Sequence, residues 1–288
     1  MRILLLFLLI PVLFSCSKDD EVVQPSGIQA TTLLNQSYGS DVNQVMDIYL
    51  PPDRNVSTTR TIVLIHGGGW TGGDKSSEAP FIDTLKRRFP DYAIFNLNYR
   101  LSTGAASLFP TQEMDVKLAF EYIYAHRNEY IISDKFVFAG ESAGAHLALL
   151  QAYKYNSPVK IKAVISFFAP TDLTDMYNNP VNANPLIPAV LAQTIGVTPV
   201  QDPAIYFSSS PVNFITTSTG VPTILFHGEN DPLVAPSQSE TVKNKLELAG
   251  IPVSYTLYPG LGHGTDWGAD TFTDAFSKIQ IFLTANVH

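Results

Sequence analysis

Residues 136–154 read FVFAGESAGAHLALLQAYK and indicate more about the architecture than any other part of the chain. The short apolar run Phe136 to Ala139 is typical of a buried strand, and Ala145 to Tyr153 is an apolar run of helical length. Between them, GESAG at 140–144 surrounds a serine with small residues. A tight turn from a strand into a helix is crowded and exposes the serine hydroxyl at the sheet edge. The pattern predicts a strand, a turn and a helix, with Ser142 as a candidate nucleophile.

The chain on either side of this segment alternates short apolar runs with longer segments of helical period. This alternation is typical of crossover helices that cover a mainly parallel sheet, and it predicts the α/β class. The predicted strands are rich in Val, Ile and Phe, as strands buried on both faces are. They are Thr61 to His66, Tyr92 to Asn98, Phe136 to Ala139, Ala163 to Phe168, Thr223 to His227 and Val253 to Tyr258.

Three further segments have a recognisable period. The segment Pro110 to Tyr130 has apolar residues at helical spacing, and Pro236 to Ala249 and Thr271 to Ala285 are amphipathic, so each is predicted to be a helix over a sheet face. The apolar residues of the first are Met114, Leu118, Tyr122 and Ala125. The opening part, Ser37 to Leu50, alternates apolar and polar residues and predicts an antiparallel hairpin at the sheet edge.

Residues 173–214 do not follow this alternation of strand and helix patterns. This segment, Leu173 to Phe214, is dense in Pro, Asn and Ser and has one helix-like stretch around Pro188 to Ile195. A long irregular insert in a compact domain is often a binding loop, so 173–214 is a candidate lid.

A serine hydroxyl needs a base to take its proton, and that base needs a carboxylate to fix its tautomer. Among the six histidines of the chain, His263 is the best candidate because PGLGHG at 259–264 is a glycine-rich loop between the last strand and the last helix. Asp231 follows the preceding strand, within HGENDPLV at 227–234, and completes the chain order Ser, Asp, His of α/β-hydrolases. Glu229 and Asp172 are the alternative carboxylates.

HGGGW at 66–70 follows the predicted strand Thr61 to His66. Because glycines carry no side chains, the backbone N–H groups of such a loop can point at the oxygen of a tetrahedral intermediate. We expect an oxyanion hole formed by Gly68, Gly69 and Ala143. The alternative is an ordinary flexible turn.

The first residues have the layout of an export signal. Arg2 precedes the apolar run Ile3 to Phe14, which is shorter than the roughly 20 residues that a membrane-spanning helix needs. Residues 1–15 are therefore predicted to be a signal peptide. Cys16, the single cysteine, lies in LFSCSKDD, which resembles the lipobox of bacterial lipoproteins and implies lipidation there. An ordinary signal peptide with an incidental cysteine is the alternative.

Residues 16–29 are polar and predict a flexible tether, which leaves 30–288 as one catalytic domain. The chain has 288 residues, 45% hydrophobic content and a formal charge of −8. Its scattered Lys and Arg residues provide no basic surface for phosphates, which argues against nucleic acid as a partner. One cysteine excludes an internal disulfide.

Several motifs together resemble the α/β-hydrolase esterases related to hormone-sensitive lipase, and more narrowly the bifunctional feruloyl and acetyl-xylan esterases. The motifs are DIYLPPD at 47–53, HGGGW at 66–70, GDK at 73–75, NYRL at 98–101, GESAGAHLA at 140–148, HGENDPLV at 227–234 and PGLGHG at 259–264. The resemblance implies an eight-stranded, mostly parallel sheet with helices on both faces, a Ser142-Asp231-His263 triad, and no metal or organic cofactor.

Two departures from the family pattern bear on function. Ala145 stands where many relatives have a second glycine, and only the tether and hairpin precede His66, where the lipase group has a helical cap. The missing cap favours the carbohydrate esterases within this resemblance. Together with the predicted lipid anchor at Cys16, it predicts an enzyme of the cell envelope that acts on acylated plant polysaccharide. The alternatives are an esterase, lipase or arylformamidase for small acyl substrates, and a non-enzymatic carbohydrate-binding lipoprotein.

Overall fold

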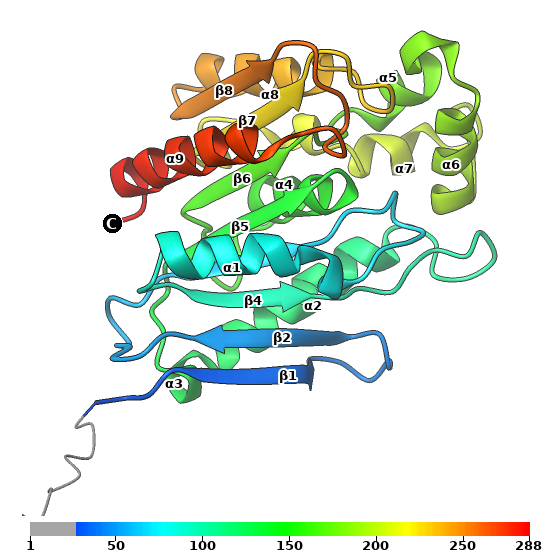
Figure 1. The fold of residues 1–288 in the computed structure, drawn as a ribbon. Helices are drawn as coiled ribbons and strands as arrows, with labels where there is room; N and C mark the ends of the chain where they lie inside the picture. The colour runs from blue at the N-terminus through cyan, green and yellow to red at the C-terminus, as the bar shows by residue number, and fades with distance from the viewer. Residues whose placement is uncertain (1–26) are drawn as a thin grey trace, which may run out of the picture.

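The computed structural model describes residues 27–288 (Figure 1). The predicted signal peptide, Cys16 and all of the tether except residues 27–29 lie outside the described residues. Within residues 27–288, no helix combines the length and the apolar character that crossing a membrane requires.

Eight strands form one sheet in the order β1-β2-β4-β3-β5-β6-β7-β8. The second strand in this order, β2, pairs antiparallel with both β1 and β4, and all other neighbours are parallel. This arrangement confirms the predicted α/β-hydrolase fold with a mostly parallel sheet. The strands are β1 (Thr31–Ser37), β2 (Val45–Leu50), β3 (Thr61–Ile65), β4 (Ala93–Leu97), β5 (Phe136–Glu141), β6 (Ala163–Phe167), β7 (Thr223–Gly228) and β8 (Val253–Tyr258).

The hairpin at the sheet edge exists, but it begins earlier than predicted. Its first strand, β1, ends at Ser37, so the window Ser37 to Leu50 contains only the turn and β2. No residue of β1 is fully buried, since β1 forms the outer edge of the sheet. A strand that buries so little apolar surface lacks the strong alternation by which half-buried strands are recognised.

Helices cover both faces of the sheet (Figure 1). One face packs against α1 (Ala79–Arg88) and α9 (Ala269–Asn286), and the other packs against α2 (Thr111–Ala125), α4 (Ala143–Lys154) and α8 (Ser237–Leu248). All residues of β3, β4, β6 and β7 are buried, as expected of strands covered on both sides. Two short elements complete this part, η1 (Lys75–Glu78) and α3 (Arg127–Tyr130).

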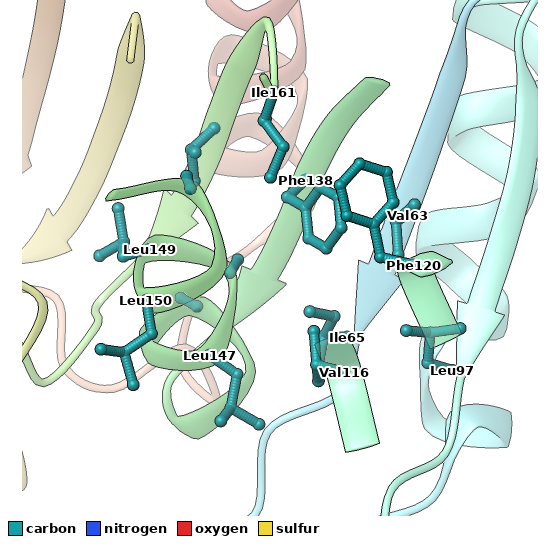
Figure 2. Close-up of a cluster of buried hydrophobic side chains, with 14 of the residues drawn as sticks. Val63, Ile65, Leu97, Val116, Phe120, Phe138, Leu147, Leu149, Leu150 and Ile161 are labelled. Atoms are coloured by element: carbon teal, nitrogen blue, oxygen red, sulfur yellow. The ribbon is translucent and has the colours of Figure 1, made fainter. Parts of the chain in front are cut away.

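The α2 helix presents a different stripe to the sheet from the one predicted. Met114 and Leu118 are 47% and 37% exposed, whereas the buried stripe is Val116, Ala119, Phe120 and Ile123. Figure 2 shows Phe120 against Phe138 of β5, with ring centroids 5.1 Å apart. Both stripes have helical spacing, and the one that fills the core contains the β-branched residues Val116 and Ile123. The prediction of this face was wrong.

Residues 173–214 contain more helix than predicted. The structure has α5 (Leu173–Asn178), η2 (Val181–Ala183), α6 (Leu186–Ile195), α7 (Pro203–Ser208) and η3 (Pro211–Phe214). The side chains of Asp172 and Asp202 accept hydrogen bonds from the first turns of α5 and α7. Helices of one or two turns show little periodicity, but these caps are a local signal for them. Figure 1 shows α5, α6 and α7 gathered beyond the carboxyl ends of the central strands.

Buried ion pairs join several of the motifs noted in the sequence. The Lys75 ammonium lies 2.8 Å from the Asp47 carboxylate, and Lys75 N–H donates to the Asn98 side chain. The Arg100 guanidinium donates to both carboxylate oxygens of Asp115, which is 1% exposed. Removing one member of such a pair leaves a buried charge without a partner, which is strongly destabilising. These motifs therefore contribute to the stability of the fold.

Candidate active site

Ser142 lies at the sharp turn between β5 and α4, with a φ of 50°, which is rare for a residue with a Cβ. Its N–H donates to the Phe167 carbonyl, 2.9 Å away. A Cβ on Gly140 would lie 2.6 Å from the carbonyl carbon of Gly144, and a Cβ on Gly144 would lie 2.1 Å from the Ile65 carbonyl oxygen. Glycine is required at both positions, because the turn packs directly against neighbouring backbone.

Sheet register brings the remaining predicted residues to Ser142. In the parallel pair β7 and β8, Gly228 is opposite Tyr258, so the loops that follow these strands emerge side by side. The His263 Nε2 atom lies 2.9 Å from the Ser142 hydroxyl oxygen, and its Nδ1 atom lies 2.6 Å from Asp231 Oδ2. The three residues selected from the sequence therefore form one continuous hydrogen-bonded line.

Asp231 is fully buried but well supplied with donors. Its Oδ1 accepts from the N–H groups of Leu233 and Val234, and its Oδ2 faces His263 and, at 3.2 Å, Nε2 of His227. Burial opposes ionisation of Asp231, but the hydrogen bonds from His227 and His263 outweigh it and hold its pKa well below the usual range. Asp231 is consequently a carboxylate near neutral pH.

The two alternative carboxylates have other partners. Glu229 is exposed and accepts from the Gly260 N–H, 3.0 Å away. Asp172 caps α5 by accepting from the Asp175 N–H. Neither carboxylate has a hydrogen bond to His263 in residues 27–288.

The HGGGW loop lies next to Ser142, because β3 pairs with β5 and Ile65 is opposite Gly140. Gly68, Gly69 and Trp70 have φ values of 105°, 60° and 62°. Within the described residues, neither glycine N–H donates a backbone hydrogen bond. Both glycines line the cavity beside Ser142.

The third residue expected in the oxyanion hole is Ala143, the first residue of α4, which is fully buried. Its amide lies in the first turn of the helix, where N–H groups have no partner within the helix. This end of a helix also has the positive end of the helix dipole.

A cavity of about 530 Å³ opens in front of Ser142. One side is formed by the glycine loop and His263, and the opposite wall is apolar and comes largely from the insert 173–214. The apolar residues of that wall are Met176, Leu186, Ile187, Val190 and Leu191. The sequence indicates the insert as a candidate binding loop but predicts none of these side chains, since the part of α6 that faces the cavity is set by tertiary packing.

Two glutamates lie close to the nucleophile, of which Glu78 is buried and Glu141 is partly buried. Glu141 and Glu78 both line a small internal cavity of about 10 Å³ whose other walls are apolar. Burial raises the pKa of Glu141. Burial, together with the nearby Glu141, raises the pKa of Glu78 to about 8. The Glu78 carboxyl has one long hydrogen bond, 3.3 Å from the Ser77 hydroxyl.

In residues 27–288, no group of three or more His, Cys, Asp or Glu side chains is arranged to hold a metal ion. The charged and polar groups at Ser142 are those needed to move a proton from a hydroxyl to an imidazole. This arrangement is suited to acyl transfer through a serine.

The chain is similar in sequence to a curated esterase. Esterase LipQ of Mycobacterium tuberculosis is 26% identical over 238 residues, which cover 78% of this chain and 55% of LipQ. The chain thus spans about half the length of that curated relative.

Two solved structures share the fold. A truncated carbohydrate esterase from gut microbiota superposes with a TM-score of 0.74 at 23% identity, over 88% of this chain and 96% of that one. A bifunctional GH43-CE protein of Bacteroides eggerthii gives 0.74 at 24% identity, over 88% of this chain and 38% of that one.

The sequence profile of the BD-FAE family matches residues 46–246. This range contains the HGGGW loop, the serine turn, the insert and Asp231. Because it covers well over half of the chain, the protein belongs to the BD-FAE family of α/β-hydrolase carbohydrate esterases.

Proposed function

We propose that this protein hydrolyses carboxylic esters with Ser142 as nucleophile, His263 as general base and acid, and Asp231 as the carboxylate that orients His263. The observation that carries the proposal is the hydrogen-bonded line from Asp231 through His263 to Ser142, with distances of 2.6 and 2.9 Å. A nucleophile, its base and an orienting carboxylate within hydrogen-bond reach are the requirements of this chemistry.

The reaction proceeds through an acyl-enzyme. The Ser142 oxygen attacks the ester carbonyl carbon as Nε2 of His263 takes the hydroxyl proton. Nδ1–H of His263 donates to ionised Asp231, which stabilises the imidazolium. His263 then gives its proton to the leaving alcohol oxygen, and the C–O bond breaks. Water attacks the acyl-enzyme by the same route and releases the acid with free Ser142.

Negative charge develops on the carbonyl oxygen during both attacks. The backbone N–H groups of Gly68, Gly69 and Ala143 are the donors that we assign to this oxygen. Loss of one such donor typically lowers the rate by roughly 10² to 10³. Backbone donors on rigid loops need no reorganisation when the charge appears.

We further propose acylated plant polysaccharide as the substrate, with acetyl or feruloyl groups removed. Membership of the BD-FAE family supports this substrate class. The fold shared with the carbohydrate esterase from gut microbiota agrees with it. A cavity of about 530 Å³ with one apolar wall has room for an acyl group larger than acetyl.

The test compares the parent with Ser142→Ala on acetylated xylo-oligosaccharides, methyl ferulate and 4-nitrophenyl butyrate. We expect Ser142→Ala to lose activity by at least about 10³-fold on every ester that the parent cleaves. The matched control is Ser57→Ala, a change at an exposed serine between β2 and β3. If Ser142→Ala cleaves the preferred ester at the parental rate, the mechanism is wrong. Preference for 4-nitrophenyl butyrate over both carbohydrate-type esters would remove the polysaccharide assignment alone.

From the sequence, we also propose that the protein is exported and anchored in the cell envelope through lipid on Cys16. Acyl chains contribute about 0.8 kcal/mol per buried CH₂, so more than one chain holds a protein at a membrane. Intact-mass measurement on protein from native membranes should show a lipidated Cys16 as the first residue. An unmodified soluble product would contradict the anchor and leave the catalytic proposal unaffected.

A further inference from the structure

One buried histidine next to the nucleophile has no role in the mechanism above. His146 lies in the first turn of α4, is 0% exposed, and donates its backbone N–H to the Ser142 carbonyl. Its Nε2 atom lies 2.7 Å from the Ser209 carbonyl oxygen, and its Nδ1 atom lies 3.2 Å from the indole Nε1 of Trp70. The ring thus contacts both the glycine loop and the insert.

These two partners fix the protonation state of His146. A carbonyl oxygen only accepts and an indole N–H only donates, so Nε2 carries the proton and Nδ1 is the acceptor. Burial lowers the pKa of His146 to about 4, in agreement with a neutral ring. A second proton on Nδ1 would face the N–H of Trp70 and break the bond between them.

Trp70 needs such an anchor because of its backbone. Its φ of 62° is unfavourable for a residue with a Cβ, and it follows two glycines that also have positive φ values. Its carbonyl accepts from the Ser102 N–H at 2.9 Å, and its indole is 3% exposed and packs edge-on against His146, with centroids 5.1 Å apart. Trp70 is therefore held through its backbone carbonyl by Ser102 and through its indole by His146.

We propose that His146 is a positioning residue, which fixes Trp70 and thereby aims the Gly68 and Gly69 N–H groups at the developing oxyanion. This inference rests on the proposed function. His146 also connects the glycine loop to the insert, because its ring bonds to Trp70 on one side and to the Ser209 carbonyl on the other. The insert forms the apolar wall of the cavity.

The test uses two substitutions of His146. In His146→Leu, the acceptor for the Trp70 indole is lost. In His146→Asn, the side-chain oxygen reaches the place of Nδ1 and accepts from Trp70, but the shorter side chain does not reach Ser209. We expect kcat to fall by roughly 10- to 100-fold in the Leu variant with KM within about threefold, and the Asn variant to keep kcat within about threefold.

Two readouts separate positioning from general stability. A trifluoromethyl ketone forms an oxyanion with the catalytic serine, so its inhibition constant should rise in the Leu variant by the factor lost in kcat/KM. The chain has two tryptophans, and thus two indole ¹H–¹⁵N signals. The Trp70 signal should move in the Leu variant and return in the Asn variant, while that of Trp267, which donates to the Gly262 carbonyl, stays in place.

Parental kcat in a folded Leu variant would overturn the inference, as would an equal loss of kcat in the Asn variant. If the Leu variant does not fold, the Asn variant decides: retained kcat with an unmoved Trp70 signal supports positioning through Trp70, and a deep loss of kcat refutes it. Ser142→Ala is measured in parallel. Undiminished activity in that variant would refute the proposed function rather than the role of His146.

Discussion

Glu78 gives the sharpest test of the electrostatics behind the nucleophile. It is 2% exposed and lies in an apolar cavity beside Glu141. Its pKa is about 8 in the folded chain, against 4.5 for a solvated glutamate. Since the folded chain binds this proton more tightly than the unfolded chain, the free energy of unfolding is unaffected below pH 4.5 and falls as the pH rises through 8.

The size of the effect follows from the two pKa values. Each pKa unit corresponds to about 1.36 kcal/mol, so keeping Glu78 in this cavity costs about 3 kcal/mol at pH 7 and about 5 kcal/mol at pH 9. Glu78→Gln keeps the shape and removes the ionisable group. We expect parent and variant to unfold at similar urea concentrations at pH 5, and the variant to be more stable by these amounts at pH 7 and 9.

Urea unfolding followed by circular dichroism at the three pH values measures the difference. Glu129→Gln, at an exposed glutamate of α3, is the control and should change the free energy of unfolding by less than about 0.5 kcal/mol at every pH. An advantage of Glu78→Gln that does not grow with pH would show that Glu78 is ionised and has a partner, and the reasoning would be refuted.

Two further predictions concern the oxyanion loop and the triad, both measured as kcat on the preferred ester. Gly68→Ala should lower kcat by roughly 10² or more, because its Cβ would lie 2.2 Å from the Gly72 carbonyl oxygen. Gly69→Ala meets nothing nearer than 3.8 Å and should retain far more activity, with a backbone cost of about 1 to 2 kcal/mol. Asp231→Asn should lower kcat by about 10⁴, since a neutral amide favours the wrong tautomer of His263; a loss below tenfold would contradict the role of Asp231.

The sequence was informative about this site because the decisive residues obey local rules. A serine between glycines after a strand, and a histidine in a glycine loop before the last helix, are recognisable without knowledge of the tertiary structure. Sheet topology then brings these loops to one edge, since the carboxyl ends of parallel strands lie together. Six predicted strands were found within two residues of their predicted ends.

Features that depend on contacts between distant residues could not be predicted. No local pattern indicates the role of His146, because its partners Trp70 and Ser209 are 76 and 63 residues away in the chain. The prediction of the buried face of α2 was wrong for a related reason. Two stripes of apolar residues have helical spacing, and only packing against β5 decides which one is buried. The residues of α6 that line the cavity could not be predicted either, because tertiary packing decides which side of α6 faces the cavity.

Two buried ionisable groups near Ser142, His146 and Glu78, change the free energy of unfolding with pH in opposite directions. The pKa of His146 is lowered to about 4, so stability is lost as the pH falls from 6.5 through 4. The pKa of Glu78 is raised to about 8, so stability is lost as the pH rises from 4.5 through 8. Between about pH 4.5 and 6.5, a rise in pH increases the free energy of unfolding through His146 and decreases it by the same amount through Glu78. The two contributions to the pH dependence of stability therefore cancel in this range. Both groups are then neutral in the fold, and the charge of Asp231 acts on His263 without competition from a buried imidazolium or from the Glu78 carboxylate.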